Sequence, residues 1–480
     1  MSFPKYPEYK ESGVEWLGNV PEHWNKVRLR RVVKLNPSKS EVSNLNRELS
    51  VSFLPMESIR DNGSINLEKS LSIGAVENGY TYFREDDVAL AKITPCFENG
   101  KGAIMRGLIN GIGFGTTELI IVRPKPSRTT SDYLHWLFLS SYFRRMGEST
   151  MYGAGGQKRV PDDFVRNLCV AIPPIKEQTA IASFLDTETS KIDGLVGEQR
   201  RLIELLKEKR QAVISHAVTK GLNPNAPMKP SGIEWLGDVP EHWKVKPLKY
   251  LAAFRSGGTP SKTVPAYWHG DVPWASSKDL KTETLADTID HITQHALDND
   301  AATLVPAGSV LVVVRGMILL HTFPVVQTLV PMAINQDLKA LTPSECIHES
   351  YLPWLLRGST TATFGQIDEA AHGTKVLRME ALTSIELPVP PIDEQLEIAE
   401  TVTKRLTQIA CLVAKAEAAI ELLQERRVAL ISAAVTGKTD VREFANASPT
   451  ATDTGPANAR SKMATSAVSR SKRNVLQETR

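Results

Sequence analysis

The stretch SGVEWLGNVPEHW at residues 12–24 decides the organisation of this 480-residue chain, because SGIEWLGDVPEHW follows at residues 231–243. Eleven of these 13 positions are identical. A second matched pair, IELLKEKRQAVISHAVT at residues 203–219 and IELLQERRVALISAAVT at residues 420–436, is identical at 12 of 17 positions. Between the matched segments the two halves look largely unrelated. Two nearly constant frames around two different inserts are the pattern expected of a molecule that does one job on two different objects.

Each insert ends in a diproline followed by Glu-Gln, in AIPPIKEQTAI at residues 171–181 and in PVPPIDEQLEI at residues 388–398. A diproline cannot lie inside a helix, so a helix is expected to begin directly after it. No proline occurs in residues 177–219 or 394–436. A straight helix of either length would measure about 64 Å, far more than the usual helix of roughly 11–12 residues.

Apolar residues recur in both segments at alternating steps of four and three, which predicts a coiled-coil seam on each helix. Two matching seams in one chain most simply pair with each other; the alternative is two separate helices that each recruit a partner. Gly194 and Gly197 each cost about 1 kcal/mol of helix propensity, so packing must hold the first helix together. The predicted seam residues are Ile181, Leu185, Ile192, Leu195, Leu202, Leu206 and Val213, and Ile398, Val402, Ile409, Leu412, Leu423 and Leu430.

Both inserts mix short strand-like runs with glycine and proline turns and lack regular βαβ alternation, which predicts an α+β fold for each. In the first, such runs lie at residues 88–93, 102–105 and 119–122, before an aromatic helical stretch at 132–146. The expected order is a first repeat segment (1–24), a first insert domain (25–176), a long helix (177–220), a second repeat segment (221–243), a second insert domain (244–392), a second long helix (393–438) and a disordered tail (439–480).

Composition is that of a soluble globular protein, with 41% apolar and 23% charged residues and a net charge of +3. Any affinity for nucleic acid must therefore come from local basic clusters. The four cysteines contain no CxxC pair, which favours a reducing cytoplasm over a disulfide framework or a zinc site. The amino terminus has no apolar signal region. The most apolar run, residues 309–323, is broken by Arg315 and His321 and is expected to form two buried strands rather than a membrane span.

Catalytic motifs are missing from the sequence. No GxxxxGK[ST] phosphate loop and no Asn/Asp-Pro-Pro-aromatic motif for amino-methylation occur. His291 and His295 stand four apart but lack the glutamate of a zinc hydrolase, so no metal site is expected. Asp271 with Asp279 and Lys281 loosely imitates the acid pair and lysine of a nuclease, which leaves a stand-alone nuclease as a weak alternative.

Binding chemistry is what remains, in glycine-flanked basic segments at equivalent places about 17 residues before each diproline. Glycine lets the backbone approach a phosphate, Lys or Arg neutralises its charge, and Gln and Arg can read base edges. The alternative is a tight turn with exposed basic residues. Polar loops at residues 92–101 and 256–268 are further candidates. The candidate DNA-binding residues are Gln157, Lys158, Arg159, Lys262, Lys278, Thr374, Lys375 and Arg378.

The repeated SGxEWLGxVPEHW, the PPIxEQ before each long helix and the IELLxExRxALIS segment resemble the specificity subunit of type I restriction–modification systems. The string from GTPS to KDL at residues 258–280 and the NQDLKAL at residues 335–341 resemble one target-recognition domain of that family. Trp16, Trp24, Trp235 and Trp243 of the repeat segments are expected to anchor each insert to the helix ends, with His23 and His242 as hydrogen-bonded packing residues.

The resemblance implies two target-recognition domains, each reading one half of a split, asymmetric sequence of double-stranded DNA. It implies two antiparallel helices that form a coiled coil with pseudo-twofold symmetry, act as a ruler and dock two methyltransferase and two restriction subunits. Those partners would use S-adenosylmethionine, ATP and magnesium, whereas this chain would be non-catalytic, bind no cofactor and lie in the cytoplasm. Gly194 and Gly197 would soften this ruler. The alternative function is a coiled-coil scaffold whose inserts bind proteins.

Overall fold

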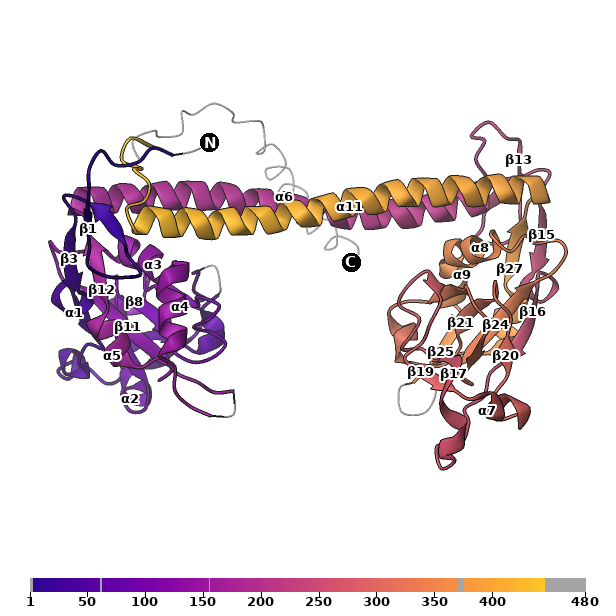
Figure 1. The fold of residues 1–480 in the computed structure, drawn as a ribbon, viewed down its shortest axis with the longest axis horizontal. Coiled ribbons are helices and arrows are strands. Elements are labelled where there is room, and N and C mark those ends of the chain that lie inside the picture. Colours follow the sequence, from indigo (N-terminus) through magenta and orange to yellow (C-terminus); the bar gives the residue numbers. More distant parts are fainter. Residues whose placement is uncertain (1–2, 61–62, 155, 370–373, 445–480) are drawn as a thin grey trace, which may run out of the picture. The chain divides into compact units, whose positions relative to one another are not determined.

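The computed structural model describes residues 3–60, 63–154, 156–369 and 374–444, which form two compact units. Unit 1 comprises Met1–Val196 and Ile420–Arg480, and unit 2 comprises Gly197–Ala419 (Figure 1). The boundaries of these units fall within the two long helices rather than at the predicted ends of the insert domains. Each unit therefore contains one insert domain, the beginning of one long helix and the end of the other.

The two long helices are α6 (Ile175–Lys220) and α11 (Ile392–Val435), of 46 and 44 residues. Both begin slightly before the predicted starts, because the residue directly after each diproline already adopts helical structure. Gly221 and Gly437 follow the two carboxyl ends with φ of +77° and +71°, the left-handed conformation in which glycine commonly ends a helix. In each unit the beginning of one long helix packs beside the end of the other (Figure 1).

The buried face of both helices follows a regular alternation, but its phase differs from the predicted seam. The buried positions that follow this alternation include Leu185, Thr189, Ile192, Val196, Ile203, Leu206 and Ala217 in α6, and Val402, Leu406, Ile409, Ala416, Leu430 and Ala434 in α11. Ile181 and Ile398 are also buried, whereas Val213 and Leu423 are half-buried.

The seam prediction was wrong for Leu195, Leu202 and Leu412, whose side chains are 51%, 42% and 49% exposed. Each of these leucines is followed by a β-branched residue, in Leu195-Val196, Leu202-Ile203 and Leu412-Val413, and that neighbour faces the core or is half-buried. Hydrophobicity cannot choose between two adjacent apolar residues. The preceding position on the buried face lies three residues before each leucine and four residues before the residue that follows it, for example Ile192 before Leu195 and Val196. The structure uses the four-residue spacing, so the second member of each pair faces inward.

The first insert domain consists of two four-stranded sheets with the predicted α+β character. One has the order β6-β5-β10-β7, from β5 (Ser50–Leu54), β6 (Ser70–Ser72), β7 (Thr81–Arg84) and β10 (Ile112–Gly115). The other has the order β4-β11-β8-β9, from β4 (Val33–Leu35), β8 (Val88–Ala91), β9 (Gly102–Ile104) and β11 (Leu119–Pro124). The accompanying helices are α1 (Leu29–Val32), α2 (Ile73–Val76), α3 (Ser131–Leu139), α4 (Ser141–Ser149) and α5 (Asp162–Asn167).

The second insert domain repeats this topology with an additional edge strand. One sheet has the order β19-β17-β23-β20, from β17 (Trp268–Ala275), β19 (Asp290–Ile292), β20 (Leu304–Val305) and β23 (Met332–Ile334). The other has the order β16-β24-β21-β22-β18, from β16 (Ala252–Ser256), β18 (Thr284–Leu285), β21 (Val310–Val313), β22 (Val325–Thr328) and β24 (Leu338–Pro343). Its helices are α7 (Gln294–Asp298), α8 (Leu352–Gly358), α9 (Thr360–Phe364) and α10 (Met379–Ser384), and a hairpin is formed by β25 (Ile367–Glu369) and β26 (Lys375–Leu377).

Short strands in and beside the repeat segments form two-stranded antiparallel sheets in both units. In unit 1, β1 (Tyr9–Glu11) pairs with β2 (Asn19–Pro21), and β3 (Asn25–Arg28) pairs with β12 (Cys169–Ile172). In unit 2, β13 (Met228–Pro230) pairs with β14 (Asp238–Pro240), and β15 (Lys244–Pro247) pairs with β27 (Glu386–Val389). The central strands correspond as well, since the parallel pair β5·β10 has its counterpart in β17·β23. Two inserts with little sequence in common therefore share one fold.

The glutamate of each Glu-Gln pair joins a repeat segment to the beginning of a long helix. In unit 1 the Glu177 carboxylate accepts hydrogen bonds from the Tyr6 hydroxyl (2.7 Å) and the Trp24 indole N–H (2.9 Å), and it lies 2.7 Å from Nε2 of His23. In unit 2 the Glu394 carboxylate accepts from the indole of Trp243 (3.0 Å). The two tryptophans are fully buried, which confirms their expected anchoring role.

The glutamine of each pair joins the insert domain to the same helix. The amide of Gln178 accepts from the backbone N–H of Thr130 (3.0 Å), directly before α3, and donates to the Pro173 carbonyl (2.9 Å). The amide of Gln395 accepts from the backbone N–H of His348 (2.8 Å), ahead of α8, and donates to the Pro390 carbonyl (2.9 Å). The adjacent glutamate and glutamine in the first turns of each long helix thus bind two different parts of the chain, the repeat segment and the insert domain.

Two further expectations need correction. The tail was expected to be disordered from residue 439, but Val441 is fully buried and the Phe444 ring packs edge-on against Phe3 at a centroid distance of 5.4 Å. Apolar side chains here complete the core of unit 1; residues 445–480 lie outside the described residues.

The apolar run at 309–323 forms only one strand, β21, because Gly316 at φ +149° turns the chain into a 3₁₀ turn at Met317–Leu320. Among the described helices, none is long and apolar enough to cross a bilayer.

Candidate functional site

In the first insert domain the predicted basic segment lies against one of the predicted polar loops. The backbone N–H of Val160 donates to the carbonyl of Lys92 (2.9 Å), and the N–H of Lys92 donates to the carbonyl of Glu118 (2.9 Å). The loop after β8, the turn before β11 and the basic segment therefore form one polar edge. These segments lie far apart in the sequence, so their proximity results from the fold.

The three candidate residues of this edge differ in how free their side chains are. Gln157 and Lys158 are exposed, and the Lys158 ammonium has no ion pair with another described residue. Arg159 instead forms a bidentate pair with Glu118, with Nη2–Oε1 and Nε–Oε2 distances of 2.8 and 2.9 Å. These hydrogen bonds lower the pKa of Glu118 below its usual range. Arg159 is thus held in place by its own chain, whereas Gln157 and Lys158 point to solvent. Gly155, which precedes them, lies outside the described residues.

The second insert domain has the same edge at the equivalent strand. The backbone N–H of Leu377 donates to the carbonyl of Val314 (2.9 Å), and the N–H of Val314 donates to the carbonyl of Asp337 (2.8 Å). The candidate cations here are engaged within the hairpin: Lys375 pairs with Glu369 at 2.7 Å and Arg378 pairs with Asp368 at 2.9 Å.

Of the remaining candidates near this hairpin, Thr374 is half-buried, and Gly373 lies outside the described residues. The ion pairs of Lys375 and Arg378 are solvent-accessible, so they stabilise the hairpin only weakly. They remain available to exchange their carboxylates for phosphates. These residues stay predictions.

Lys262 and Lys278 converge on a single cavity of about 520 Å³ in unit 2. Lys262 comes from the loop at residues 256–268, and Lys278 follows β17. The indoles of Trp268 and Trp274 also line this cavity, with their centroids 5.2 Å apart at 83°. Neither lysine has an ion pair with another described residue.

Two further polar residues of this cavity were not among the predicted site residues. Asn335 and Asp337, in the turn between β23 and β24, line its wall. They lie within the NQDLKAL motif that carries part of the family resemblance, so the sequence did contain a signal for them. What it could not give was the juxtaposition of this turn with the loop at 256–268.

The carboxylate proposed for a nuclease has a structural role. Oδ2 of Asp279 accepts from the backbone N–H and the hydroxyl of Ser276 (2.8 and 2.9 Å), and Oδ1 accepts from the N–H of Ile289 (2.9 Å). Nε2 of His291 lies 2.8 Å from Asp287 rather than facing His295. Within the described part of the chain, no group of three or more His, Cys, Asp or Glu side chains could hold a metal ion. All four cysteines are unpaired.

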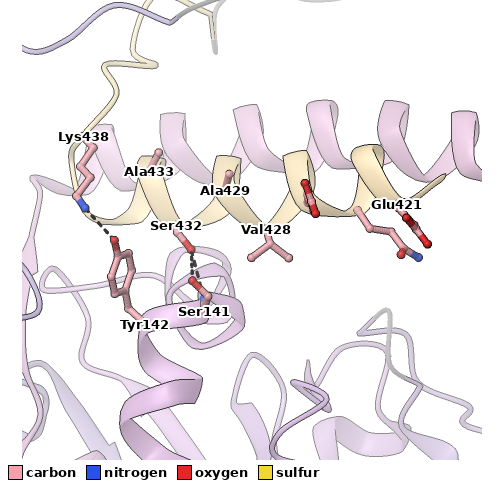
Figure 2. A pocket seen from close by; sticks show the side chains of 10 residues that line it. Ser141, Tyr142, Glu421, Val428, Ala429, Ser432, Ala433 and Lys438 are labelled. Atoms are coloured by element: carbon pink, nitrogen blue, oxygen red, sulfur yellow. Dashed lines mark hydrogen bonds between the residues drawn. The ribbon is translucent and has the colours of Figure 1, made fainter. Parts of the chain in front are cut away.

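A second, shallower groove of about 730 Å³ follows the end of α11 in unit 1 (Figure 2). The Lys438 ammonium donates to the Tyr142 hydroxyl (2.9 Å) and lowers its pKa, while the Ser141 and Ser432 hydroxyl oxygens lie 2.9 Å apart (Figure 2). These contacts tie α4 to α11. Glutamates from α11 line the groove as well, which disfavours a phosphate there. The hydrogen bonds beside this groove therefore position the insert domain, and the groove is not the candidate nucleic-acid site.

Comparison with known proteins identifies the family of the two insert domains and the long helices. The family model described as "Type I restriction modification DNA specificity domain" matches the chain twice, at residues 21–204 and 240–422. The chain belongs to this family. The two matches cover both insert domains and most of both long helices.

Individual relatives agree with this assignment. The specificity subunit of the type I restriction enzyme EcoEI from Escherichia coli is 43% identical over 186 residues, which is 39% of this chain and 31% of that relative. The chain thus aligns with only about a third of that protein. A solved structure from work on assembly and conformational transition of a type I R-M system matches 87% of this chain and 98% of its own, with a TM-score of 0.69 and 15% identity.

The HsdS subunit from Thermoanaerobacter tengcongensis matches 89% of this chain and 99% of its own, with a TM-score of 0.57 and 16% identity. At these identities the two structural matches establish the shared fold alone. The family model is what assigns the chain, and it does not favour the alternative of a protein-binding scaffold.

Proposed function

We propose that this chain is the DNA sequence-recognition subunit of a type I restriction–modification complex. Each insert domain would read one half of a split, asymmetric target in double-stranded DNA. The observation that carries this proposal is the repetition of one fold with different side chains at equivalent places. The turn before β11 carries Glu118 paired to Arg159, whereas the equivalent turn before β24 carries Asn335 and Asp337 without such a cation.

DNA affinity in this proposal comes mainly from cations that neutralise phosphates and is therefore salt-dependent. Lys158, Lys262 and Lys278 are the best placed, because they are exposed and free of ion pairs with other described residues. Lys375 and Arg378 would contribute by exchanging their exposed carboxylate partners. Gln157, Arg159 and Thr374 complete the proposed set through hydrogen bonds to bases or backbone.

The two long helices are proposed to form an antiparallel coiled coil that sets the separation of the two readers, in a pseudo-twofold arrangement. Support comes from the matching 4,3 alternation of buried residues on α6 and α11 and from the pairing of the two helices inside each unit. Gly194 and Gly197 are exposed and would make this ruler locally softer.

The chain itself would carry no catalytic centre and bind no cofactor. Chemistry would belong to partners: two methyltransferase subunits that use S-adenosylmethionine to methylate adenine, and two restriction subunits that use ATP and Mg²⁺. The proposed compartment is the cytoplasm, which suits four unpaired cysteines.

Methylation-sensitive sequencing of the host genome tests this function. The expected result is a two-part motif containing modified adenine that disappears when the gene for this chain is deleted and returns when it is restored. A genome in which the deletion leaves every modified motif unchanged would contradict the proposal.

A further inference from the structure

The cavity in the second insert domain is built by a close approach of backbone segments. The N–H of Gly258 donates to the Ile334 carbonyl (2.9 Å), and the indole N–H of Trp274 donates to the Gly258 carbonyl (3.0 Å). A Cβ at the neighbouring Gly257 would lie only 2.0 Å from the Ile334 carbonyl oxygen, so this position requires glycine. The loop at 256–268 is thereby fixed above the β23–β24 turn.

The opposite wall of the cavity contains a β-bulge. The register of β17 with β19 shifts between Trp268 and Val272, and His269 within the bulge adopts φ of +63°. Bulges redirect side chains, and a non-glycine residue in the left-handed region is uncommon. Both indole N–H groups are satisfied by backbone carbonyls, so Trp268 and Trp274 offer the cavity only apolar surface.

Asn335 and Asp337 place one donor and one acceptor side by side in this cavity. Oδ1 of Asn335 accepts from the backbone N–H of Asp337 at 3.2 Å, which orients the amide. Its Nδ2 lies 3.5 Å from Oδ2 of Asp337, too far for a strong hydrogen bond. The Asn335 side chain is 93% buried, and Asp337 has no ion pair with another described residue. Both groups therefore have unused hydrogen-bonding capacity.

The charge of Asp337 indicates what it can contact. A carboxylate repels phosphate oxygens, but it accepts hydrogen bonds from the amino groups of bases. Lys262 and Lys278 line the same cavity, together with a second carboxylate, Asp290, and the two lysines suit the phosphates beside the contacted base. The site thus has a base-facing acceptor and donor flanked by backbone-facing cations.

Among the four bases, only adenine presents one acceptor, N7, beside one donor, N6–H₂, in the major groove. Guanine presents two acceptors there, cytosine a donor, and thymine an acceptor with a methyl group. The free N–H of Asn335 fits N7, and the free carboxylate oxygen of Asp337 fits N6–H₂. We propose that Asn335 and Asp337 read an adenine in the half-site of the second insert domain. This inference rests on the proposed DNA-recognition function and names residues and a base for it.

The first insert domain supports a different preference at the same place. Thr116 and Glu118 occupy the equivalent turn, where the Thr116 hydroxyl accepts from the Glu118 N–H at 3.2 Å. The Glu118 carboxylate is occupied by both nitrogens of the Arg159 fork. No free donor–acceptor pair of the Asn335–Asp337 kind results, so the adenine assignment does not extend to the first insert domain.

Binding selection from a randomised duplex library, with the full chain in complex with its methyltransferase subunits, tests this assignment. Asp337→Ala and Asn335→Asp should each reduce discrimination at one A·T position of one half-site by about 5- to 150-fold and leave the other half-site unchanged. Asn335→Asp retains the Oδ1 acceptor of the turn but adds a buried charge beside Asp337. Its Tm is therefore compared with that of wild type, and Asp337→Ala, which adds no charge, must affect the same A·T position. Lys262→Ala is the matched control: it should weaken all duplexes equally and reduce the salt slope by about one.

Modified DNA makes the test atom-specific. Replacing that adenine by 7-deazaadenine removes N7 and should weaken wild-type binding, with no further loss in the Asn335→Asp variant. The inference is overturned if both variants keep the wild-type motif, or if 7-deazaadenine weakens Asn335→Asp as much as wild type. A wild-type complex without any sequence preference would instead overturn the proposed function itself.

Discussion

At the scale of the residue, Glu177 and Glu394 explain why the EHW and PPIxEQ motifs occur together. Each carboxylate lies in the first turns of a long helix and accepts a hydrogen bond from the indole N–H of a repeat-segment tryptophan. The glutamine that follows accepts a hydrogen bond from a backbone N–H of the insert domain. A buried carboxylate is costly unless it is hydrogen-bonded, and Glu177 is compensated by three neighbouring side chains. Each motif is therefore needed for the other to be stable.

Replacement of Glu177 by alanine should destabilise unit 1 by about 2–5 kcal/mol. The hydroxyl of Tyr6 and the indole N–H of Trp24 would lose their acceptor in the core, and each unsatisfied buried group costs roughly 1–3 kcal/mol. Thermal unfolding should show this as a lower Tm. Glu22→Ala, at an exposed position of the same repeat segment, is the control and should leave Tm almost unchanged. Equal Tm values for Glu177→Ala and wild type would refute the role assigned to this carboxylate.

At the scale of the element, the two long helices show how far the sequence predicts structure. The diproline and the absence of later prolines locate both helices to within a few residues, because proline is excluded from the helix interior. The phase of the seam was predicted only in part, since Leu195-Val196 and Leu202-Ile203 offer two adjacent apolar side chains. Contacts with the neighbouring helix decide between them, and a single sequence does not contain those contacts.

The same limit applies to the candidate site. Glycine and basic residues single out the candidate segments from local chemistry alone, although Lys375 lies in strand β26 rather than in a loop. The ion pair of Arg159 with Glu118 and the cavity formed by Trp274 and Asn335 arise from residues 41 and 61 positions apart. Such pairings depend on strand order, which the irregular inserts do not reveal.

The corrected seam predicts opposite outcomes for two adjacent leucines. Leu206→Asp buries a charge at a position that is 7% exposed and should cost about 3 kcal/mol or more. Leu205→Asp places the same charge at a position that is 50% exposed and should have little effect. Chemical denaturation of the two variants measures the difference. If Leu205→Asp were as destabilising as Leu206→Asp, the assigned phase of α6 would be wrong.

At the scale of the whole molecule, the chain repeats one fold twice with different side chains. Both units have corresponding sheet orders, apart from the additional edge strand β18 of unit 2, and they share the Glu-Gln contacts and the polar edge at the turn before β11 or β24. Family membership, established by two matches to one domain model, agrees with this internal repeat. In the proposed function, a duplicated framework with independently varied readers would allow one half of a target to change without the other.

Exchange of one insert tests this account most directly. Residues 25–174 replace residues 244–391, so that both frames carry the first insert domain, and the target is determined by binding selection with the methyltransferase complex. The account predicts a symmetric target, with two inverted copies of the half-site that the first insert domain reads in the wild type. A variant that retains the original second half-site, or that binds one uninterrupted sequence, would contradict it.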